Sequence, residues 1–442
     1  MFEYGYSQED ITPHRGIGLC GYLNPRYNRG AHDRLLLKAV VFKDGDGLAA
    51  LVEYDLCLMP ATLSSRLAEA VAKALPSLAG KTVFAATHTH TGPYTHGLFT
   101  DDCTDADYLN EVIQKTVIAL RNAQLGLAPA ELFATSTQCS TLAFCRRFRM
   151  KNGVILTNPG KLNPDVVAPE GDIDPVIPIL AIKQEGAIRL LIVNISNHAD
   201  TVGGDFVSAD WPGRMEREIQ YRLGEDIPVM SLTAPQGNIN HFNIATDADQ
   251  TNYAEACRIG KGYAAAVLAA LYSLRKIDFQ GVSIQTTIFE GPYLTVTDEE
   301  YAEAAATYEK YKDATMEPGR DFTSEDIAKG TPYAKKYFAQ ALMECRDKLP
   351  AEKRLEQVSV IKFGDAVALV TLPGEPFVEV TRQIRAKSPF KVTMVVALAM
   401  DAIGYMAMPE NYGNGGYETL PGPGKPSKYL AQELIKQATS LL

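Results

Sequence analysis

Several features that are common in chains of this length are scarce or missing here. The sequence has one tryptophan and seven histidines in 442 residues, and its seven cysteines include no CxxC pair. An odd number of scattered cysteines indicates neither a disulfide framework nor a thiolate zinc site. It is typical of a protein in a reducing cytosol. Any bound metal would therefore have histidine, carboxylate or tyrosine ligands.

Long apolar runs and an excess of basic residues are also missing. No stretch approaches the ~20 apolar residues that span a bilayer, and the N-terminus lacks the features of a signal peptide. The net charge of −10 argues against a nucleic-acid partner. We therefore expect a cytoplasmic protein without stable membrane insertion that acts on a small-molecule substrate. The sequence does not indicate its oligomeric state.

Strand and helix signals alternate over most of the chain. Apolar runs flank short turns at 43–47, 184–186 and 364–365, which predicts antiparallel hairpins. Amphipathic helices are expected at 62–75 and 107–124. The prediction is a mixed α/β (α+β) fold, in which large mixed β-sheets with many antiparallel hairpins are flanked by helices. A doubly wound parallel sheet is not expected.

The domain organisation is predicted to be simple. No linker, internal repeat or low-complexity run divides the sequence, so we interpret residues 1–442 as one domain. Residues from about 297 to 356 are rich in Glu, Lys, Ala and Tyr, and they predict a helical insertion between strands. A final helix is expected at about 427–441.

The most informative segment is 87–93, which reads Thr-His-Thr-His-Thr-Gly-Pro. It follows an apolar run at 81–86 that predicts a buried strand, so His88 and His90 fall where a strand opens into a loop. Residues i and i+2 of an extended segment share a face, so both rings can point into one cavity. The pattern fits a metal site, and equally a pair of polar histidines in a surface loop.

Three further side chains with ligating atoms stand just past apolar runs in the same way. They are His198, Glu375 in a Pro-Gly-Glu segment, and Tyr405. Two imidazoles, a carboxylate and a phenol can form a zinc shell that leaves room for an activated water. Taken singly, Glu375 also fits an ordinary loop residue and Tyr405 a packing residue.

These motifs resemble those of the neutral/alkaline (non-lysosomal) ceramidases. Segment 87–93 is similar to the family signature, and the resemblance covers nearly the whole chain. It runs from Asp-Ile-Thr-Pro at 10–13, through Gly-Ala-His-Asp at 30–33 and the strand ending in Asp55, to Tyr417. The resemblance implies the fold of the family's catalytic domain. The family's C-terminal immunoglobulin-like domain is not expected here.

The resemblance also implies roles for individual residues. The implied zinc ligands are His88, His198, Glu375 and Tyr405. The implied catalytic residues are His90, Arg146 and Tyr417. Tyr417 stands twelve residues after Tyr405, which is the interval between the two tyrosines of the family. His90 is expected to stay off the metal and to face the water or the substrate carbonyl.

One departure changes the expected chemistry. The family's catalytic serine lies in a Gly-Asp-Val-Ser-Pro-Asn segment, which is similar in position to 237–242 here, and Asn240 replaces the serine. An amide can exchange hydrogen bonds but cannot act as that nucleophile. Asn240 is therefore placed among the catalytic residues without a nucleophilic role. Residues expected beside the substrate are His96, His241 and Asp210, although Asp210 equally fits a helix cap.

The predicted function is zinc-dependent hydrolysis of an amide or ester bond by a metal-activated water, on an unidentified and soluble substrate. Arg146 is expected to hold a substrate oxygen, and Tyr417 to donate a hydrogen bond to the tetrahedral intermediate. Two alternatives remain open. One is a zinc enzyme of carbohydrates or other small polar metabolites, and the other is a non-catalytic binding protein that keeps the metal pocket.

Overall fold

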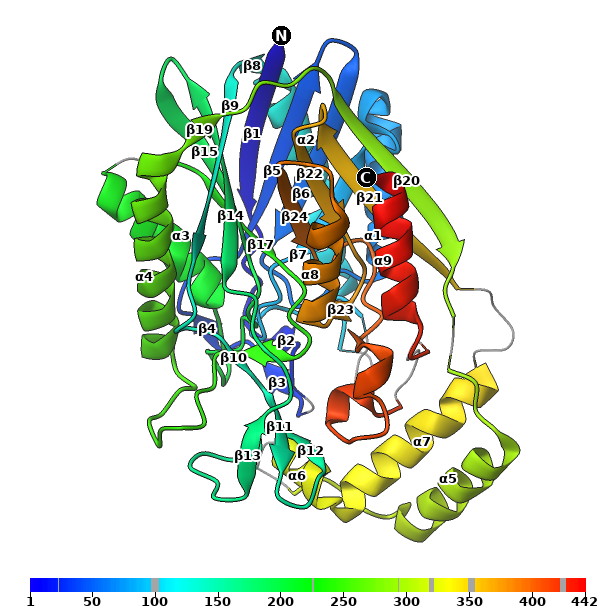
Figure 1. Ribbon diagram of the computed structural model, residues 1–442. Helices are drawn as coiled ribbons and strands as arrows, with labels where there is room; N and C mark the ends of the chain where they lie inside the picture. Colours follow the sequence, from blue (N-terminus) through cyan, green and yellow to red (C-terminus); the bar gives the residue numbers. More distant parts are fainter. Residues whose placement is uncertain are drawn as a thin grey trace.

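Three β-sheets form the body of the molecule (Figure 1). The computed structural model describes residues 1–22, 24–96, 103–224, 226–292, 294–317, 322–348, 354–421 and 427–442. The first sheet has the order β7 (Thr82–Ala86), β6 (Gly47–Tyr54), β5 (Leu36–Asp44), β1 (Phe2–Asp10), β8 (Ala128–Pro129). The second has the order β17 (Val229–Thr233), β15 (Ala187–Ile195), β14 (Val176–Gln184), β9 (Glu131–Gln138), β19 (Arg275–Lys276). The third has the order β20 (Val282–Glu290), β21 (Leu355–Phe363), β22 (Val367–Thr371), β24 (Val392–Val396).

Strand pairing combines antiparallel hairpins with one parallel pair in each of these sheets. The parallel pairs are β6 with β7, β15 with β17, and β22 with β24. The hairpins are β5–β6, β14–β15 and β21–β22, at the three turns that the sequence indicates. The mixed α/β prediction is therefore confirmed.

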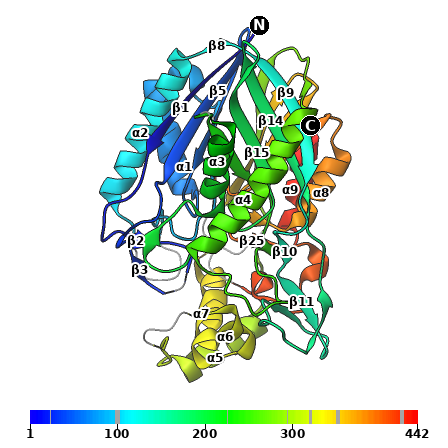
Figure 2. The same ribbon diagram turned by 90° about the vertical axis from the view of Figure 1, so that its left-hand side faces the viewer.

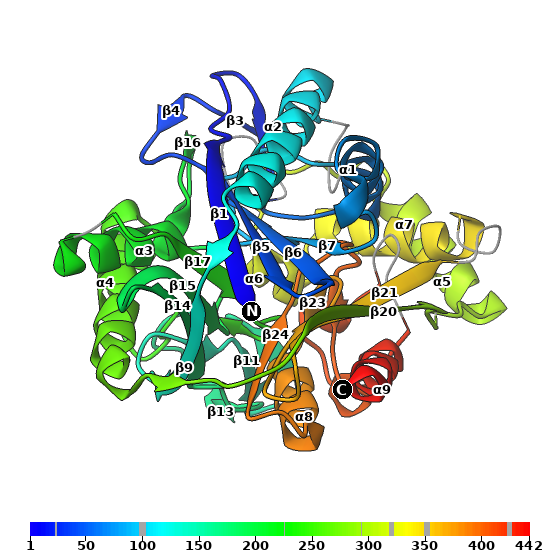
Figure 3. The ribbon, with the colours of Figure 1, turned by 90° about the horizontal axis from the view of Figure 1, so that it is seen from above.

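Helices cover the outer face of each sheet, while the inner faces share one core (Figure 3). The helices on the first sheet are α1 (Ala61–Ala74) and α2 (Ala106–Leu125). Those on the second are α3 (Asp210–Leu223) and α4 (Tyr253–Ala270). Those on the third are α8 (Val378–Lys387) and α9 (Leu430–Leu441). The final helix, α9, begins three residues later than the sequence predicts.

Burial on both faces explains the uninterrupted apolar runs of the sequence. In β15, Leu190 and Ile192 belong to the shared central core, whereas Leu191 and Val193 pack under α3 and α4. Successive side chains of a strand point to opposite faces, so a strand buried on both sides requires apolar residues at every position. The strands that carry the candidate ligands are of this kind.

Smaller elements lie beyond one end of the three sheets (Figures 1 and 2). The short strands are β2 (Gly18–Leu19), β3 (Arg26–Tyr27), β4 (Gly30–Ala31), β10 (Phe144–Cys145), β11 (Arg147–Met150), β12 (Ile155–Thr157), β13 (Val166–Pro169), β16 (Phe206–Val207), β18 (Ile239–Asn240), β23 (Glu375–Pro376) and β25 (Tyr405–Met406). Between β20 and β21 come α5 (Asp298–Tyr311), α6 (Ser324–Lys329) and α7 (Pro332–Lys348). The 3-10 helices η3 (Pro409–Asn411) and η4 (Tyr417–Thr419) also lie in this part of the molecule, whereas η1 (Pro76–Leu78) directly precedes β7 and η2 (Leu271–Ser273) directly precedes β19. Helix α6 contacts β12 and η4.

Backbone hydrogen bonds join the sheets to one another at this end. The segment after β24 donates from Ala397 N to the Thr233 carbonyl (2.8 Å) and from Met400 N to the Phe84 carbonyl (2.9 Å). Asn194 adds a side-chain bridge, because its amide donates to the Val395 carbonyl at 3.0 Å. The ends of the three sheets are thus held in contact. Among the described residues no helix is both long and apolar enough to cross a membrane.

One buried carboxylate in the third sheet gives a testable pH dependence. Burial raises the pKa of Glu356 to about 7, which Arg354 at 3.3 Å only partly offsets. The folded carboxyl holds its proton more tightly than the unfolded one, so stability falls as the pH rises from about 4.5 to about 7. We expect the free energy of unfolding of Glu356→Gln to exceed that of wild type by about 2 kcal/mol at pH 8. At pH 4 the two values should be equal.

Urea unfolding at the two pH values measures this difference. Glu303→Gln is the matched control, because Glu303 is exposed. An equal pH dependence in Glu356→Gln and wild type would contradict the assignment of the raised pKa to Glu356.

Candidate metal centre

His88 is held so that one ring nitrogen contacts the backbone and the other faces the candidate metal centre. It lies two residues past β7, with a φ of 71°, a left-handed conformation that is uncommon outside glycine. Its Nδ1 lies 2.8 Å from the Cys57 carbonyl, which can only accept. That contact places the hydrogen on Nδ1 and leaves the Nε2 lone pair free to ligate.

His198 is held in the same way by a different part of the chain. It follows β15, and its Nδ1 lies 2.7 Å from the Ile239 carbonyl at the start of β18. Its Nε2 therefore also points inward. Glu375 begins β23, and its Oε2 lies 3.2 Å from Nε2 of both His88 and His198. All three residues are nearly inaccessible to solvent.

The spacing of these three atoms fits a zinc ion. Tetrahedral coordination with bonds of about 2.0–2.1 Å separates neighbouring ligand atoms by about 3.3 Å, close to the two contacts made by Glu375. Oε2 of Glu375 is buried without a hydrogen bond of regular geometry in the described part of the chain. A divalent cation would compensate this carboxylate, so the donor set suits a metal.

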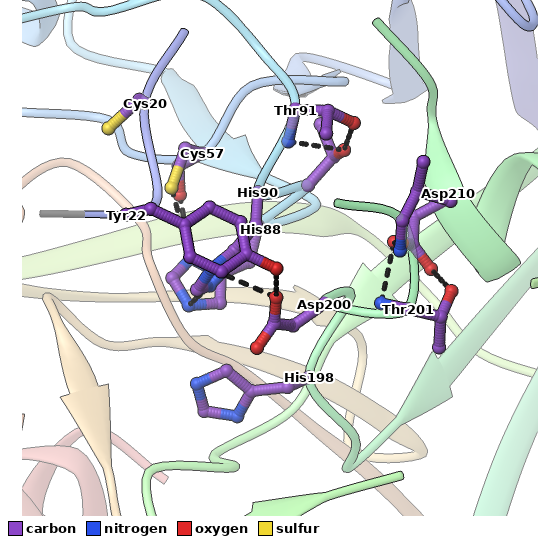
Figure 4. A network of polar contacts seen from close by, with 12 residues as sticks. Cys20, Tyr22, Cys57, His88, His90, Thr91, His198, Asp200, Thr201 and Asp210 are labelled. Atoms are coloured by element: carbon purple, nitrogen blue, oxygen red, sulfur yellow. Dashed lines mark hydrogen bonds and ion pairs between the residues drawn. The ribbon is translucent and has the colours of Figure 1, made fainter. Parts of the chain in front are cut away.

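His90 is close to His88, but it does not belong to the triplet of ligand atoms that includes His198 and Glu375. Within the described ranges, the groups that could share an ion form two triplets, His88–His198–Glu375 and Cys57–His88–His90. Nε2 of His90 lies 3.2 Å from Nε2 of His88, and its Nδ1 lies 3.4 Å from Oδ1 of Asp200 (Figure 4). His90 therefore lies beside the centre formed by Glu375 and the other two histidines.

The charges of the centre follow from burial and mutual contact. Burial lowers the pKa of His90 to about 3 and, with Arg146 nearby, that of His198 to about 4. Burial opposes the ionised form of Glu375, but the two imidazoles hold its pKa well below the usual range. Burial also lowers the pKa of His88, and Glu375 reverses this to a net rise. The centre thus places imidazole nitrogens beside an anionic carboxylate, which attracts a cation.

Arg146 and the two tyrosines border the centre. Nη1 of Arg146 lies 3.3 Å from Nε2 of His198, and its guanidinium carbon lies 5.0 Å from the Tyr405 ring centre and 5.2 Å from that of Tyr417. The two tyrosine hydroxyls are 3.2 Å apart. Tyr405 lies on β25, which pairs with β23 so that Tyr405 stands opposite Glu375. These predicted site residues therefore come together.

The remaining predicted residues have mainly structural contacts. Asn240 donates to Asn158 and accepts from the backbone of Phe242. His241 is buried, with Nε2 at 2.7 Å from the Gln250 carbonyl.

Asp210 begins α3, and its Oδ1 accepts from the backbone N–H of Trp211 at 2.6 Å, so the carboxylate binds the first turn of that helix. Its other contacts lie in a neighbouring loop. It accepts from the backbone N–H of Thr201 (2.8 Å) and Val202 (2.9 Å), and so fixes the loop that follows His198. Figure 4 shows its carboxylate turned toward Thr201 and away from the three imidazoles. His96 is half-buried, and it adjoins residues 97–102, which lie outside the described part of the chain.

Two carboxylates at the centre, one fully buried and one partly buried, were missed at the sequence level. Glu418 is fully buried, with Oε1 at 2.8 Å from Nε of Arg146 and Oε2 at 2.8 Å from Nη1 of Arg147. Asp200 faces His90 and accepts from the Tyr22 hydroxyl at 2.5 Å. Asp200 stands two residues after His198, and this proximity is the one sequence signal that could have found it.

The fold and the centre define an α/β protein with a buried imidazole–carboxylate site where three sheets meet. The structure is similar to the crystal structure of neutral ceramidase from Pseudomonas aeruginosa, with a TM-score of 0.73 and 17% identity, covering 100% of this chain and 74% of that one. It is also similar to a ceramidase complexed with C2, with a TM-score of 0.72 and 18% identity, covering 100% and 75%. No family model matches the sequence, and a search of curated proteins gave no match. The chain has the neutral-ceramidase fold with a strongly divergent sequence, which confirms the resemblance at the level of the fold.

Proposed function

We propose that this protein is a zinc-dependent hydrolase of amide or ester bonds in a small, soluble substrate. The observation that carries the proposal is the convergence of His88, His198 and Glu375, at zinc-like spacing, in a fold shared with ceramidases. Each imidazole has its outer nitrogen fixed by a backbone carbonyl, as in zinc sites. A cytoplasmic location remains part of the proposal.

In this proposal the ligands are His88, His198 and Glu375, with Tyr405 as the fourth. When bound, zinc supplies Lewis-acid polarisation of a carbonyl and activation of water. His90 is placed to accept a proton, because its Nε2 lies beside the centre, at 3.2 Å from Nε2 of His88. Once His198 Nε2 serves as a ligand, Nη1 of Arg146 is available to a substrate oxygen, while Gly237 and Glu418 hold the rest of the guanidinium.

The proposed hydrolase function does not include ceramide as a substrate. By the sequence resemblance Asn240 stands in place of the family's serine, and both ends of its amide are engaged, with Asn158 and with Phe242. It supplies no nucleophile, so attack by water is the route that the side chains support. Tyr417 stands beside Tyr405 and is in place to donate its hydroxyl to the oxyanion.

Metal analysis combined with a substrate panel tests this function. We expect one zinc per chain, and zinc-dependent hydrolysis of some members of a panel of acyl amides, esters and lactones. Chelation should remove the activity, and added zinc should restore it. Bound zinc without turnover across the panel would favour the non-catalytic alternative. A protein that binds no zinc would contradict both.

A further inference from the structure

The backbone on both sides of His90 is fixed by Gly21 and Arg26 and by the loop after His198. The His90 N–H donates to the Ala199 carbonyl at 3.0 Å, and its own carbonyl accepts from Nη2 of Arg26 at 2.7 Å. Gly21 has a φ of 106°, and a Cβ there would lie 2.7 Å from Cα of His90. The backbone at Gly21 thus passes directly against His90, and the placement of the ring is determined by tertiary contacts.

Asp200 is the charged group that faces the outer nitrogen of this ring. Its Oδ1 lies 3.4 Å from Nδ1 of His90, and the same oxygen accepts from the Tyr22 hydroxyl at 2.5 Å. The edge of the Tyr22 ring packs on the imidazole, with ring centres 5.7 Å apart, and Arg26 covers Tyr22 at 4.2 Å. The 3.4 Å separation is long for a hydrogen bond, as is common in catalytic sites without substrate.

We propose that Asp200, braced by the Tyr22 hydroxyl, is a positioning residue that holds His90 as a proton acceptor. The carboxylate accepts the Nδ1 hydrogen, which fixes the tautomer with a lone pair on Nε2, the nitrogen that faces the metal centre. Nδ1 of His88 and His198 faces a neutral backbone carbonyl instead. A carboxylate adds a negative charge that stabilises the imidazolium after proton transfer.

The proton transfers in this arrangement balance. His90 takes one proton at Nε2 from the attacking water and returns it to the leaving amine or alcohol, so the ring ends in its starting state. This step rests on the proposed hydrolase function. The orientation of the ring does not, and it can be measured without turnover.

The test is the tautomer of His90, observed by two-bond ¹H–¹⁵N NMR correlation in protein with ¹⁵N-labelled histidine, with and without zinc. Only seven histidines contribute, and His90→Gln identifies the signals of His90. We expect the hydrogen on Nδ1 in the wild type. Asp200→Ala should lose this preference, and Asp200→Asn, which keeps an acceptor oxygen, should retain part of it. A wild-type hydrogen on Nε2, or an unchanged tautomer in Asp200→Ala, would overturn the proposal.

Kinetics provide the second readout. In Asp200→Ala we expect kcat to fall about 100-fold, with KM within about 3-fold and zinc content unchanged. Asp205→Ala is the matched control on the same loop, because the Asp205 side chain is 39% exposed and lies 4.0 Å from the exposed Arg29. Equal effects of the two substitutions would overturn the positioning role. The wild-type tautomer still decides the proposal if a variant fails to fold or if no substrate is turned over.

Discussion

His88→Ala is expected to abolish stoichiometric zinc binding and to reduce hydrolysis at least 1000-fold, to about the uncatalysed background. Loss of this imidazole leaves His198, Glu375 and the proposed fourth ligand Tyr405, and so removes one of the two imidazole donors of the proposed shell. Substitution of residues that only hydrogen-bond to metal ligands costs about 10–100-fold in metal affinity, and loss of a ligand should cost more. The measurements are metal content and competition with a chromophoric chelator.

His14→Ala is the matched control, because His14 is exposed and far in sequence from the centre. It should keep wild-type zinc and activity. Full zinc occupancy in His88→Ala would show that the ion lies elsewhere, and the proposed centre would then be wrong.

Glu418→Gln is expected to lower the free energy of unfolding by about 3–5 kcal/mol. Glu418 compensates two buried guanidinium groups and also accepts from Thr157 at 2.7 Å. Burial opposes its ionisation, but Arg146 and Arg147 hold the pKa of Glu418 below its usual value, so it is anionic at neutral pH. The amide of Gln keeps the shape and removes the charge, which leaves part of the arginine charge uncompensated.

The same substitution should disturb the centre, since Arg146 reaches both Glu418 and His198. Chemical denaturation measures the stability, and kcat of the folded fraction measures the site. Glu410→Gln is the control, because Glu410 is exposed on the same segment. A loss below about 1 kcal/mol would mean that Arg147, through Glu170 at 2.5 Å, needs no second carboxylate.

Local sequence patterns were sufficient for the three hairpins and for several of the helices. The turns of the three hairpins are short and rich in Gly, Asp and Glu, and the adjoining runs are mostly apolar because both strand faces are largely buried. The same patterns placed His88, His198 and Glu375 just past strands. The single-domain prediction for 1–442 stays untested, although the structure has α5, α6 and α7 where the helical insertion was expected.

The sequence by itself determined which side chains stand at strand ends, because a strand, its turn and the residue after it depend on neighbours along the chain. Only the tertiary structure decided that three of these ends meet, and that His90 lies beside the Glu375 triplet. It also decided the partners of Asp200 and Glu418, and the burial of Asp210 against the loop after His198. Contacts between residues far apart in the chain depend on how whole sheets pack, and no local pattern encodes that packing.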